Sequence, residues 1–89
     1  LMREQVQESL NDFQKLGQKA IPSKGWIRTI RDALGMSSYV LAKRLGCARA
    51  NVTLMEQRER KGTISLEKLE QVARILDCKL VYCLVPIES

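Results

Sequence analysis

The sequence contains no histidine, and this absence limits the chemistry that the chain could perform. Histidine is the commonest general base in enzymes, and without it neither a Ser-His nor a Cys-His nucleophile pair can form. The carboxylates show no catalytic spacing, and there is no glycine-rich loop of the kind that cradles phosphates. We therefore expect that the protein is not an enzyme and uses no cofactor.

Cysteines are few and widely spaced: three, at positions 47, 78 and 83. An odd number at wide spacing, in a chain without histidine, argues against both a disulfide framework and a zinc site. The sequence therefore predicts no metal. We interpret the cysteines as small buried or half-buried thiols in a reducing cytosol.

Long hydrophobic runs are also missing. No apolar stretch approaches the ~20 residues that a membrane-spanning helix needs, and no charged-then-apolar leader pattern opens the chain. The 89 residues suffice for one domain around a single core. We expect no membrane partner.

The net charge of +5 is concentrated in the middle of the chain. Residues 24–63 carry nine lysines and arginines but three acids, whereas the segments on either side are close to neutral. Such a field attracts phosphate backbones, and equally anionic membranes and acidic proteins. A membrane-binding role for residues 3–20 is disfavoured, because helices of that kind have a cationic polar face and this segment is neutral.

Hydrophobic periodicity predicts five helices and one strand. The first helix covers 3–20 and ends before Pro22, because a residue that precedes proline avoids helical backbone. The other helices are expected at 26–34, 39–45, 49–58 and 66–76, with a charged loop at 58–62. Ser37 or Ser38 would cap the third helix, and Ser65 the fifth. The apolar run 79–85, closed by Pro86, predicts a strand. The chain thus divides into an N-terminal helix (1–22), a helical domain (23–77) and a C-terminal strand (78–89).

Residues 38–57 have the pattern of two short helices joined by a tight turn. One residue must be small where such helices cross, and Ala42 is small. The turn needs positive φ, which Gly46 adopts without strain. Apolar residues occupy the positions that would face the core: Leu41, Leu45, Cys47, Val52 and Met55. This spacing predicts a helix-turn-helix unit.

With these residues identified, the stretch from Trp26 to Leu76, centred on SSYVLAKRLGCARANVTLMEQ, resembles the lambda-repressor/Cro (xenobiotic-response-element type) helix-turn-helix family. The segments GWIRTIRDALGMSSYVLAKRLG and LDCKLVYCLVP are similar to the bacterial group called mobile mystery protein A. The resemblance implies an all-α, five-helix lambda-repressor-like DNA-binding domain, with an N-terminal extra helix and a short C-terminal β-strand. It also implies a transcriptional regulator, commonly a repressor, in the bacterial cytoplasm and associated with the nucleoid. The narrower group is often encoded beside a Fic-domain protein, which implies an antitoxin-like alternative in which the chain holds that enzyme.

Two positions depart from the family pattern. Ala48 stands where the family usually has a serine that caps the second helix of the motif, and the loss of a cap costs about 0.5–2 kcal/mol. The uncapped amides could instead face a DNA phosphate. Ser38 stands where glutamine is common, and serine reaches a phosphate but makes no bidentate contact to adenine.

The second helix of the motif would read DNA with its N-terminal part. If Val52 and Met55 face inward, the helical period turns outward Arg49, Ala50, Thr53, Leu54 and Gln57. The methyl groups of this set suit the C5-methyl of thymine, although Leu54 could also belong partly to the core. Arg49 suits O6 and N7 of guanine, or a phosphate.

Further polar residues are candidates for phosphate contacts: Ser38, Tyr39, Asn51, Arg58, Arg60 and Lys61. The run 58–61 is equally consistent with a solvated loop. We expect Lys43 and Arg44 on a solvated face. Trp26 stands at a core spacing, so packing is expected of it rather than stacking on a base.

A single short helix reads little sequence, and proteins of this kind bind as two-fold dimers with half-sites one helical turn apart. A lone strand leaves its backbone edge unpaired and open to another chain. The candidate dimer residues are therefore Leu80, Val81, Tyr82, Cys83, Leu84 and Val85. Two alternatives remain: the helix at 3–20 forms the dimer, or the run 80–85 packs on its own domain. The expected partners are double-stranded DNA, a second copy and, in the antitoxin-like alternative, a Fic-domain protein.

Overall fold

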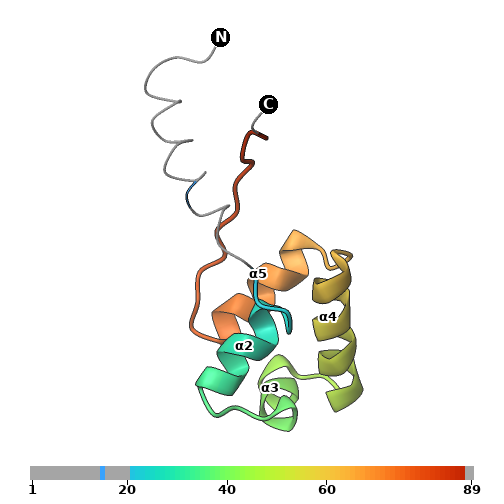
Figure 1. The fold of residues 1–89 in the computed structure, drawn as a ribbon. Coiled ribbons are helices and arrows are strands. Elements are labelled where there is room, and N and C mark those ends of the chain that lie inside the picture. The colour runs from blue at the N-terminus through green and yellow to red at the C-terminus, as the bar shows by residue number, and fades with distance from the viewer. Residues whose placement is uncertain (1–14, 16–20, 88–89) are drawn as a thin grey trace.

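The computed structural model describes residue 15 and residues 21–87, and this part of the chain forms four α-helices (Figure 1). Helix α2 spans Trp26–Ala33, α3 spans Ser38–Leu45, α4 spans Arg49–Lys61 and α5 spans Leu66–Ile75. The four helices pack into one body, from which the C-terminal segment leads away. The predicted helix at 3–20 lies, apart from residue 15, outside the described residues. The prediction of an all-α fold is confirmed for the described part.

Side chains and glycines at the helix ends explain where the helices begin and end. Ser37 and Ser65 accept hydrogen bonds from the backbone N–H groups of the third residue of α3 and of α5, both at 3.1 Å. Gly46 and Gly62 close α3 and α4 in the left-handed conformation, which glycine adopts without a Cβ clash. Of the two serines left open by the sequence, Ser37 is the cap of α3.

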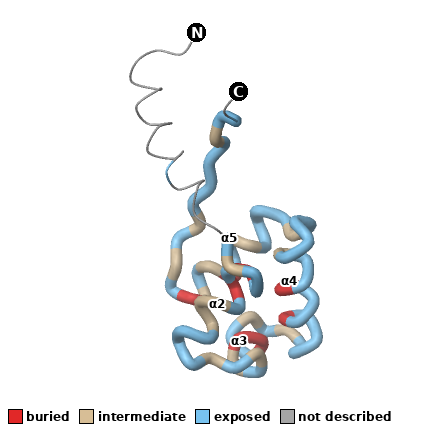
Figure 2. The backbone as a smooth tube through the Cα atoms, viewed as in Figure 1, coloured by how far each residue is buried: buried red, intermediate tan, exposed pale blue. Residues whose placement is uncertain are grey.

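The core lies where the four helices meet (Figure 2). Leu41, Val52 and Val72 have no exposed surface and come from α3, α4 and α5 respectively. Ala42 is buried on α3, in the unit where α3 packs against α4, as expected of the small residue at a helix crossing. Helix α2 contributes Ile27, whereas the neighbouring Trp26 keeps half of its surface exposed.

A buried ion pair joins α2 to α4. Arg31 Nε donates a hydrogen bond to Glu56 Oε2 at 2.9 Å, and Arg31 Nη2 donates to Glu56 Oε1 at 3.2 Å. The two side chains retain 12% and 8% of their exposure. Arg31 Nη1 also donates to the carbonyl oxygen of Met36 at 3.1 Å, which ties the α2–α3 connection to the same group. This bidentate geometry offsets the desolvation of the two charges.

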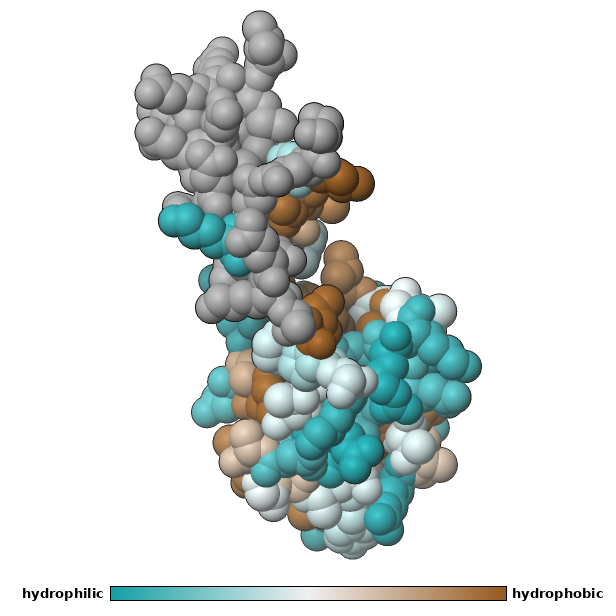
Figure 3. All heavy atoms as spheres, viewed as in Figure 1, coloured by the Kyte–Doolittle hydropathy of each residue, from teal (hydrophilic) through white to brown (hydrophobic). Residues whose placement is uncertain are grey.

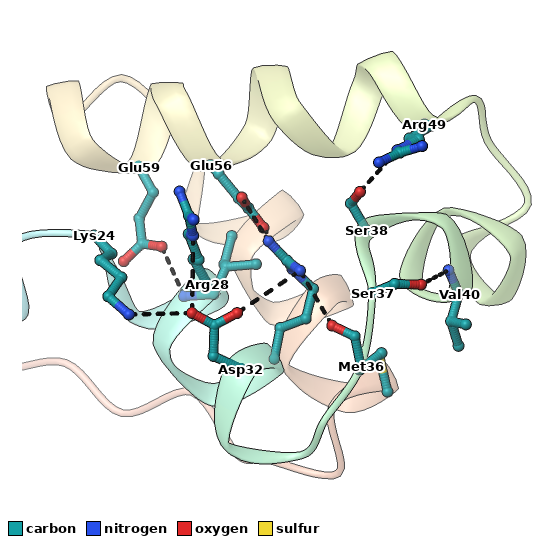
Figure 4. Close-up of polar contacts among 12 residues, drawn as sticks. Lys24, Arg28, Asp32, Met36, Ser37, Ser38, Val40, Arg49, Glu56 and Glu59 are labelled. Carbon is teal, nitrogen blue, oxygen red and sulfur yellow. Dashed lines mark hydrogen bonds and ion pairs between the residues drawn. The ribbon is translucent and has the colours of Figure 1, made fainter.

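One turn further along α4, Glu59 caps the start of α2. Its carboxylate accepts hydrogen bonds from the backbone N–H groups of Trp26 and Ile27, at 2.7 and 2.9 Å. A helix leaves these amides without an internal partner, and its dipole favours a negative charge there. Gly25 has a φ of 83°, and a Cβ at this position would lie 2.9 Å from Glu59 Oε1. Figure 4 shows Glu56 and Glu59 both pointing from α4 toward α2.

Two predicted elements differ from the structure. Helix α4 continues to Lys61, so the loop predicted at 58–62 is wrong. Its residues there favour helix, and Glu59 finds a partner on α2 from a helical position. Residues 78–87 form no strand within the described part of the chain. A strand needs the ladder hydrogen bonds of a neighbour, and the four helices of a single copy supply none.

Replacing Glu56 with glutamine should destabilise the fold strongly, because the mostly buried Arg31 then keeps, among the described residues, only its longer contact with Asp32, at 3.9 Å, as an ion pair. Breaking a buried pair from one side costs about 3–5 kcal/mol in other proteins. The same change at Glu70, whose pair with Arg74 is exposed, should cost at most about 1 kcal/mol. Urea unfolding followed by circular dichroism measures both free energies. Similar losses in the two variants would contradict the importance of the buried pair.

Candidate nucleic-acid interface

Helices α3 and α4 form two crossed helices joined by a tight turn, as the spacing of residues 38–57 predicts. The turn begins at Gly46, whose φ is 71°. Val52 and Met55 of α4 face the core, and Leu45 and Cys47 pack against it from α3 and the turn. This arrangement leaves the opposite side of α4 facing solvent (Figure 2).

The residues predicted to read bases are all exposed on α4: Arg49, Ala50, Thr53, Leu54 and Gln57. Leu54 keeps 39% of its surface, so it is neither a core residue nor a fully free one. Ala50, Leu54, Gln57 and Lys61 follow one another at intervals of three or four and therefore share one face of the helix. The structure thus gathers these side chains on one side of α4, and their contact with DNA stays a prediction.

Both carboxylates of α4 are turned away from that face. Glu56 and Glu59 are held by α2, and within residues 21–87 no carboxylate pairs with the cations of α4, which are Arg49, Arg58, Arg60 and Lys61. Figure 3 shows hydrophilic side chains over much of the visible helical body. The electrostatic potential outside α4 is therefore positive, because no carboxylate among the described residues neutralises its cations.

The carboxylate of Asp32, in α2, is in contrast paired with nearby cations. Asp32 receives a hydrogen bond from Lys24 Nζ at 3.1 Å and lies 3.8 Å from Arg28 Nε (Figure 4). The Lys24 contact holds the pKa of the Asp32 carboxyl below its ordinary value. Lys24 and Arg28 are therefore paired with a carboxylate of α2, whereas the cations of α4 have no carboxylate partner among the described residues.

The start of α3 is held against the start of α4. Arg49 Nε donates a hydrogen bond to Ser38 Oγ at 3.0 Å (Figure 4). A guanidinium carries five N–H donors, so this contact leaves four for another partner. The sequence assigned Ser38 to a phosphate and Arg49 to a base, and the structure places the two in direct contact.

The remaining candidates for phosphate contacts lie around the same helix. Tyr39 is 60% exposed. Asn51, Arg58, Arg60 and Lys61 are exposed too. Because α4 runs through residue 61, the helix sets the directions of these cations. Arg58 stands two turns after Asn51, so both occupy the same side of α4.

Two polar residues of α5 lie beside α4, and no signal in the sequence indicates this position. Lys68 and Gln71 line a depression of about 170 Å³ together with residues of α4 that include Asn51, Leu54 and Arg58. The sequence shows that both residues stand beside the apolar stripe of α5. It does not show the packing that turns this side of α5 toward α4.

The predicted dimer residues mostly extend away from the helical body. Val81, Tyr82 and Leu84 keep 67%, 70% and 89% of their exposure, and Cys83 is exposed as well. Leu80 and Val85 are partly covered. The start of the segment, at Leu80 and Val81, lines an apolar groove of about 290 Å³ with residues of α2 and α5. Figure 3 shows hydrophobic side chains on the segment that leaves the body.

Two features bear on other classes of site. Across the part of the chain that the structure describes, we find no grouping of three or more His, Cys, Asp or Glu side chains that could hold a metal ion. No described helix has the length and hydropathy needed to cross a bilayer.

Two crossed helices with an exposed, cationic second helix define a helix-turn-helix protein. Residues 27–81 match the family of Cro/C1-type HTH DNA-binding domains. The chain belongs to this family, and is a DNA-binding regulator. Comparison with curated proteins and with solved structures gave no match. The predicted relation to the lambda-repressor/Cro family is confirmed.

Introducing a serine at Ala48 should stabilise the protein, since α4 begins without a side-chain cap and its N-cap backbone already has the extended conformation, with φ −74° and ψ 151°. A serine there should accept a hydrogen bond from an amide of the first turn and raise the free energy of unfolding by about 0.5–2 kcal/mol. Ser65→Ala, which removes the existing cap of α5, should lower it by a similar amount. Urea titration of both variants tests the pair. A destabilised Ala48→Ser would show that this helix start is constrained in another way.

Proposed function

We propose that the protein is a sequence-specific regulator of transcription that binds double-stranded DNA as a dimer and acts as a repressor, including of its own genes. The observation that carries the proposal is the outward face of α4. This face combines small apolar and amide side chains with cations that have no carboxylate partner in the described part of the chain. Such a surface suits the major groove, where bases are read between two phosphate backbones.

The base-reading part of the proposal follows from the chemistry of the exposed residues. Ala50, Thr53 and Leu54 present methyl groups, which suit the C5-methyl of thymine. Arg49 stands at the start of α4 and keeps guanidinium donors beyond its contact with Ser38, so it suits O6 and N7 of a guanine. We propose a half-site with thymines opposite the methyl-bearing residues and a guanine opposite Arg49. Gln57 completes the set, one turn further along the helix.

Phosphate contacts are proposed for the polar residues that surround this face: Ser38, Tyr39, Asn51, Arg58, Arg60 and Lys61. Ser38 accepts a hydrogen bond from Arg49, and Tyr39 lines a shallow hollow with Arg49, so both lie beside the start of α4. Since Ala48 offers no cap, the first amides of α4 lack a side-chain acceptor. Amides at the start of a helix favour phosphate oxygens as partners. These contacts would set the position of α4 on the duplex without reading its sequence.

Arg49→Ala should weaken binding to a selected half-site by about 1–3 kcal/mol and relax the preference at one base pair. Selection from random duplexes, followed by fluorescence anisotropy on the selected and on altered sites, measures both effects. Arg44→Ala, a loss of the same charge from α3, should leave base preference unchanged. Half-sites without any thymine preference, or an equal loss on every sequence for Arg49→Ala, would contradict the proposed reading.

Dimerisation is proposed through Leu80–Val85, with residues 23–77 as the DNA-binding part and 78–89 as the dimer element. The segment carries exposed Val81, Tyr82 and Leu84. Its backbone has no strand partner within the described chain. Two such segments from two copies would satisfy each other's backbone groups and cover the apolar side chains.

Leu84→Asp should shift the protein toward monomer, because it places a charge in the proposed contact without touching the core. Light scattering over a range of concentrations gives the mass, and deletion of residues 79–89 should act in the same way. Leu34→Asp serves as the control, because Leu34 is another exposed leucine, 55% exposed and remote from the segment in sequence. A dimer that survives both changes in the segment would exclude it as the interface.

A second candidate function is that of an antitoxin-like module, in which the chain also holds a partner enzyme of the Fic type. The observation that favours it is the same apolar segment together with the half-exposed Trp26, both at the groove between α2 and α5. A stable complex with the neighbouring gene product, lost in Trp26→Ala while the dimer and DNA binding by α4 persist, would support this candidate. The Fic type of the partner is what the narrower resemblance to the mobile mystery protein A group implies.

A further inference from the structure

A depression between α4 and α5 is lined by polar groups that lie outside the proposed reading face of α4. This reading face consists of the proposed base-contacting residues Arg49, Ala50, Thr53, Leu54 and Gln57. The walls of the depression include Asn51 and Arg58 from α4 and Lys68 and Gln71 from α5. Leu54, one of the proposed reading residues, also lines it. The depression therefore begins at the edge of the reading face and ends on another helix.

The charge of this depression is positive from both sides. Among the described residues neither Arg58 nor Lys68 takes part in an ion pair, whereas Arg74 of α5 pairs with Glu70 at 2.7 Å. Lys68 Nζ instead donates a hydrogen bond to Gln71 Oε1 at 3.2 Å. An ammonium has three donors, so two remain free, and the Gln71 amide keeps its own N–H groups.

The position of the depression relative to α4 indicates which ligand it would meet. An α-helix with its side chains is about 10–12 Å across, and the major groove is about 12 Å wide. A helix that lies in the groove therefore has a sugar-phosphate backbone close to each flank. Ser38 and Arg49 occupy one flank of α4. The depression with Arg58 and Lys68 occupies the flank toward α5.

We propose that Lys68 and Arg58 form a phosphate-binding site for the DNA backbone, with α5 as a third DNA-contacting element beside α3 and α4. Both cations donate hydrogen bonds to a non-bridging oxygen of one phosphate, and Gln71 orients the Lys68 ammonium from behind. The site anchors the flank of α4 that faces away from Ser38. It rests on the proposed function, because the ligand is the duplex that α4 reads.

The alternative is that Lys68 and Gln71 form only a surface hydrogen bond between residues three apart on one helix, with no part in binding. The two alternatives differ in the salt dependence of DNA binding. Each phosphate that a protein neutralises contributes about 0.9 to the slope of log K against log salt concentration. A surface contact without DNA contributes nothing to that slope.

The test measures binding of the full chain to its selected duplex and to an unrelated duplex, by fluorescence anisotropy at several salt concentrations. The double variant Lys68→Gln/Arg58→Gln should lower the slope by about 0.9, which corresponds to an affinity about eightfold lower at ~0.1 M salt when referred to ~1 M. The loss should be the same on both duplexes, because a phosphate carries no sequence information. Lys68→Gln and Arg58→Gln should each lower the slope by a smaller amount, because the remaining cation still contacts the same phosphate.

Lys24→Gln is the matched control, since it removes the same charge from an exposed position outside the depression, where the ammonium already pairs with Asp32. It should leave the slope unchanged, and unfolding of the Lys68 variant should match that of the wild type. Equal effects of Lys68→Gln and Lys24→Gln on a chain that binds its duplex normally would overturn the phosphate site alone. A wild-type chain that binds no duplex would instead overturn the proposed function, and the phosphate site with it.

Discussion

The contact of α4 with α2 through Glu56 and Glu59 is the constraint on which the rest of the structure depends. Both carboxylates stand on the inner side of α4, one turn apart, and each meets a positive group of α2. One meets the Arg31 guanidinium and the other the amides at the start of the helix. An ion pair that is mostly buried requires a defined geometry, because either charge alone would be costly in that place. This contact therefore holds α4 at a defined position relative to α2.

The same contact shapes the surface that α4 presents. With its acids turned inward, α4 shows solvent its cations and a few small apolar or amide side chains. Had either carboxylate faced outward, it would have lowered the positive potential and repelled a phosphate backbone. The inner contact thus supports the fold and leaves the outer face free of local negative charge. This double effect connects the packing of the domain with its binding of DNA.

The C-terminal segment, residues 78–87, lies mostly outside the core. The helical body has a small core, built around seven buried apolar residues, and the segment adds to it only at its start, near Leu80. Beyond that point its side chains are mostly apolar and exposed, Leu84 and Ile87 almost completely, although Val85 is partly covered. Apolar surface of this kind is stabilised when another surface covers it. The proposed contact between chains through this segment rests on that exposure.

Local patterns allowed much of the helical domain to be predicted. The helix-turn-helix unit depends on Ala42, Gly46 and the apolar spacing around them, and the start of α5 depends on Ser65. These are rules about neighbours in sequence, so they can be read without coordinates. The outward positions of Ala50, Thr53 and Gln57 follow from the helical period in the same way. The predicted end of α4 is too early, although residues 58–61 favour helix and Gly62 is a suitable cap; the contact of Glu59, with a partner 33 residues earlier, belongs to the tertiary structure.

What the sequence by itself determined is therefore the identity of the motif, the basic character of the middle of the chain and the side of α4 that faces out. Only the tertiary structure decided which groups the carboxylates of α4 contact. It also decided that Arg49 contacts Ser38 and that Lys68 of α5 lines the same depression as Arg58 of α4. Helical periodicity gives the direction of a side chain relative to its own axis. Contacts between helices depend on how those axes cross, and this angle is set by the packing of the core together with the polar contacts between α2 and α4.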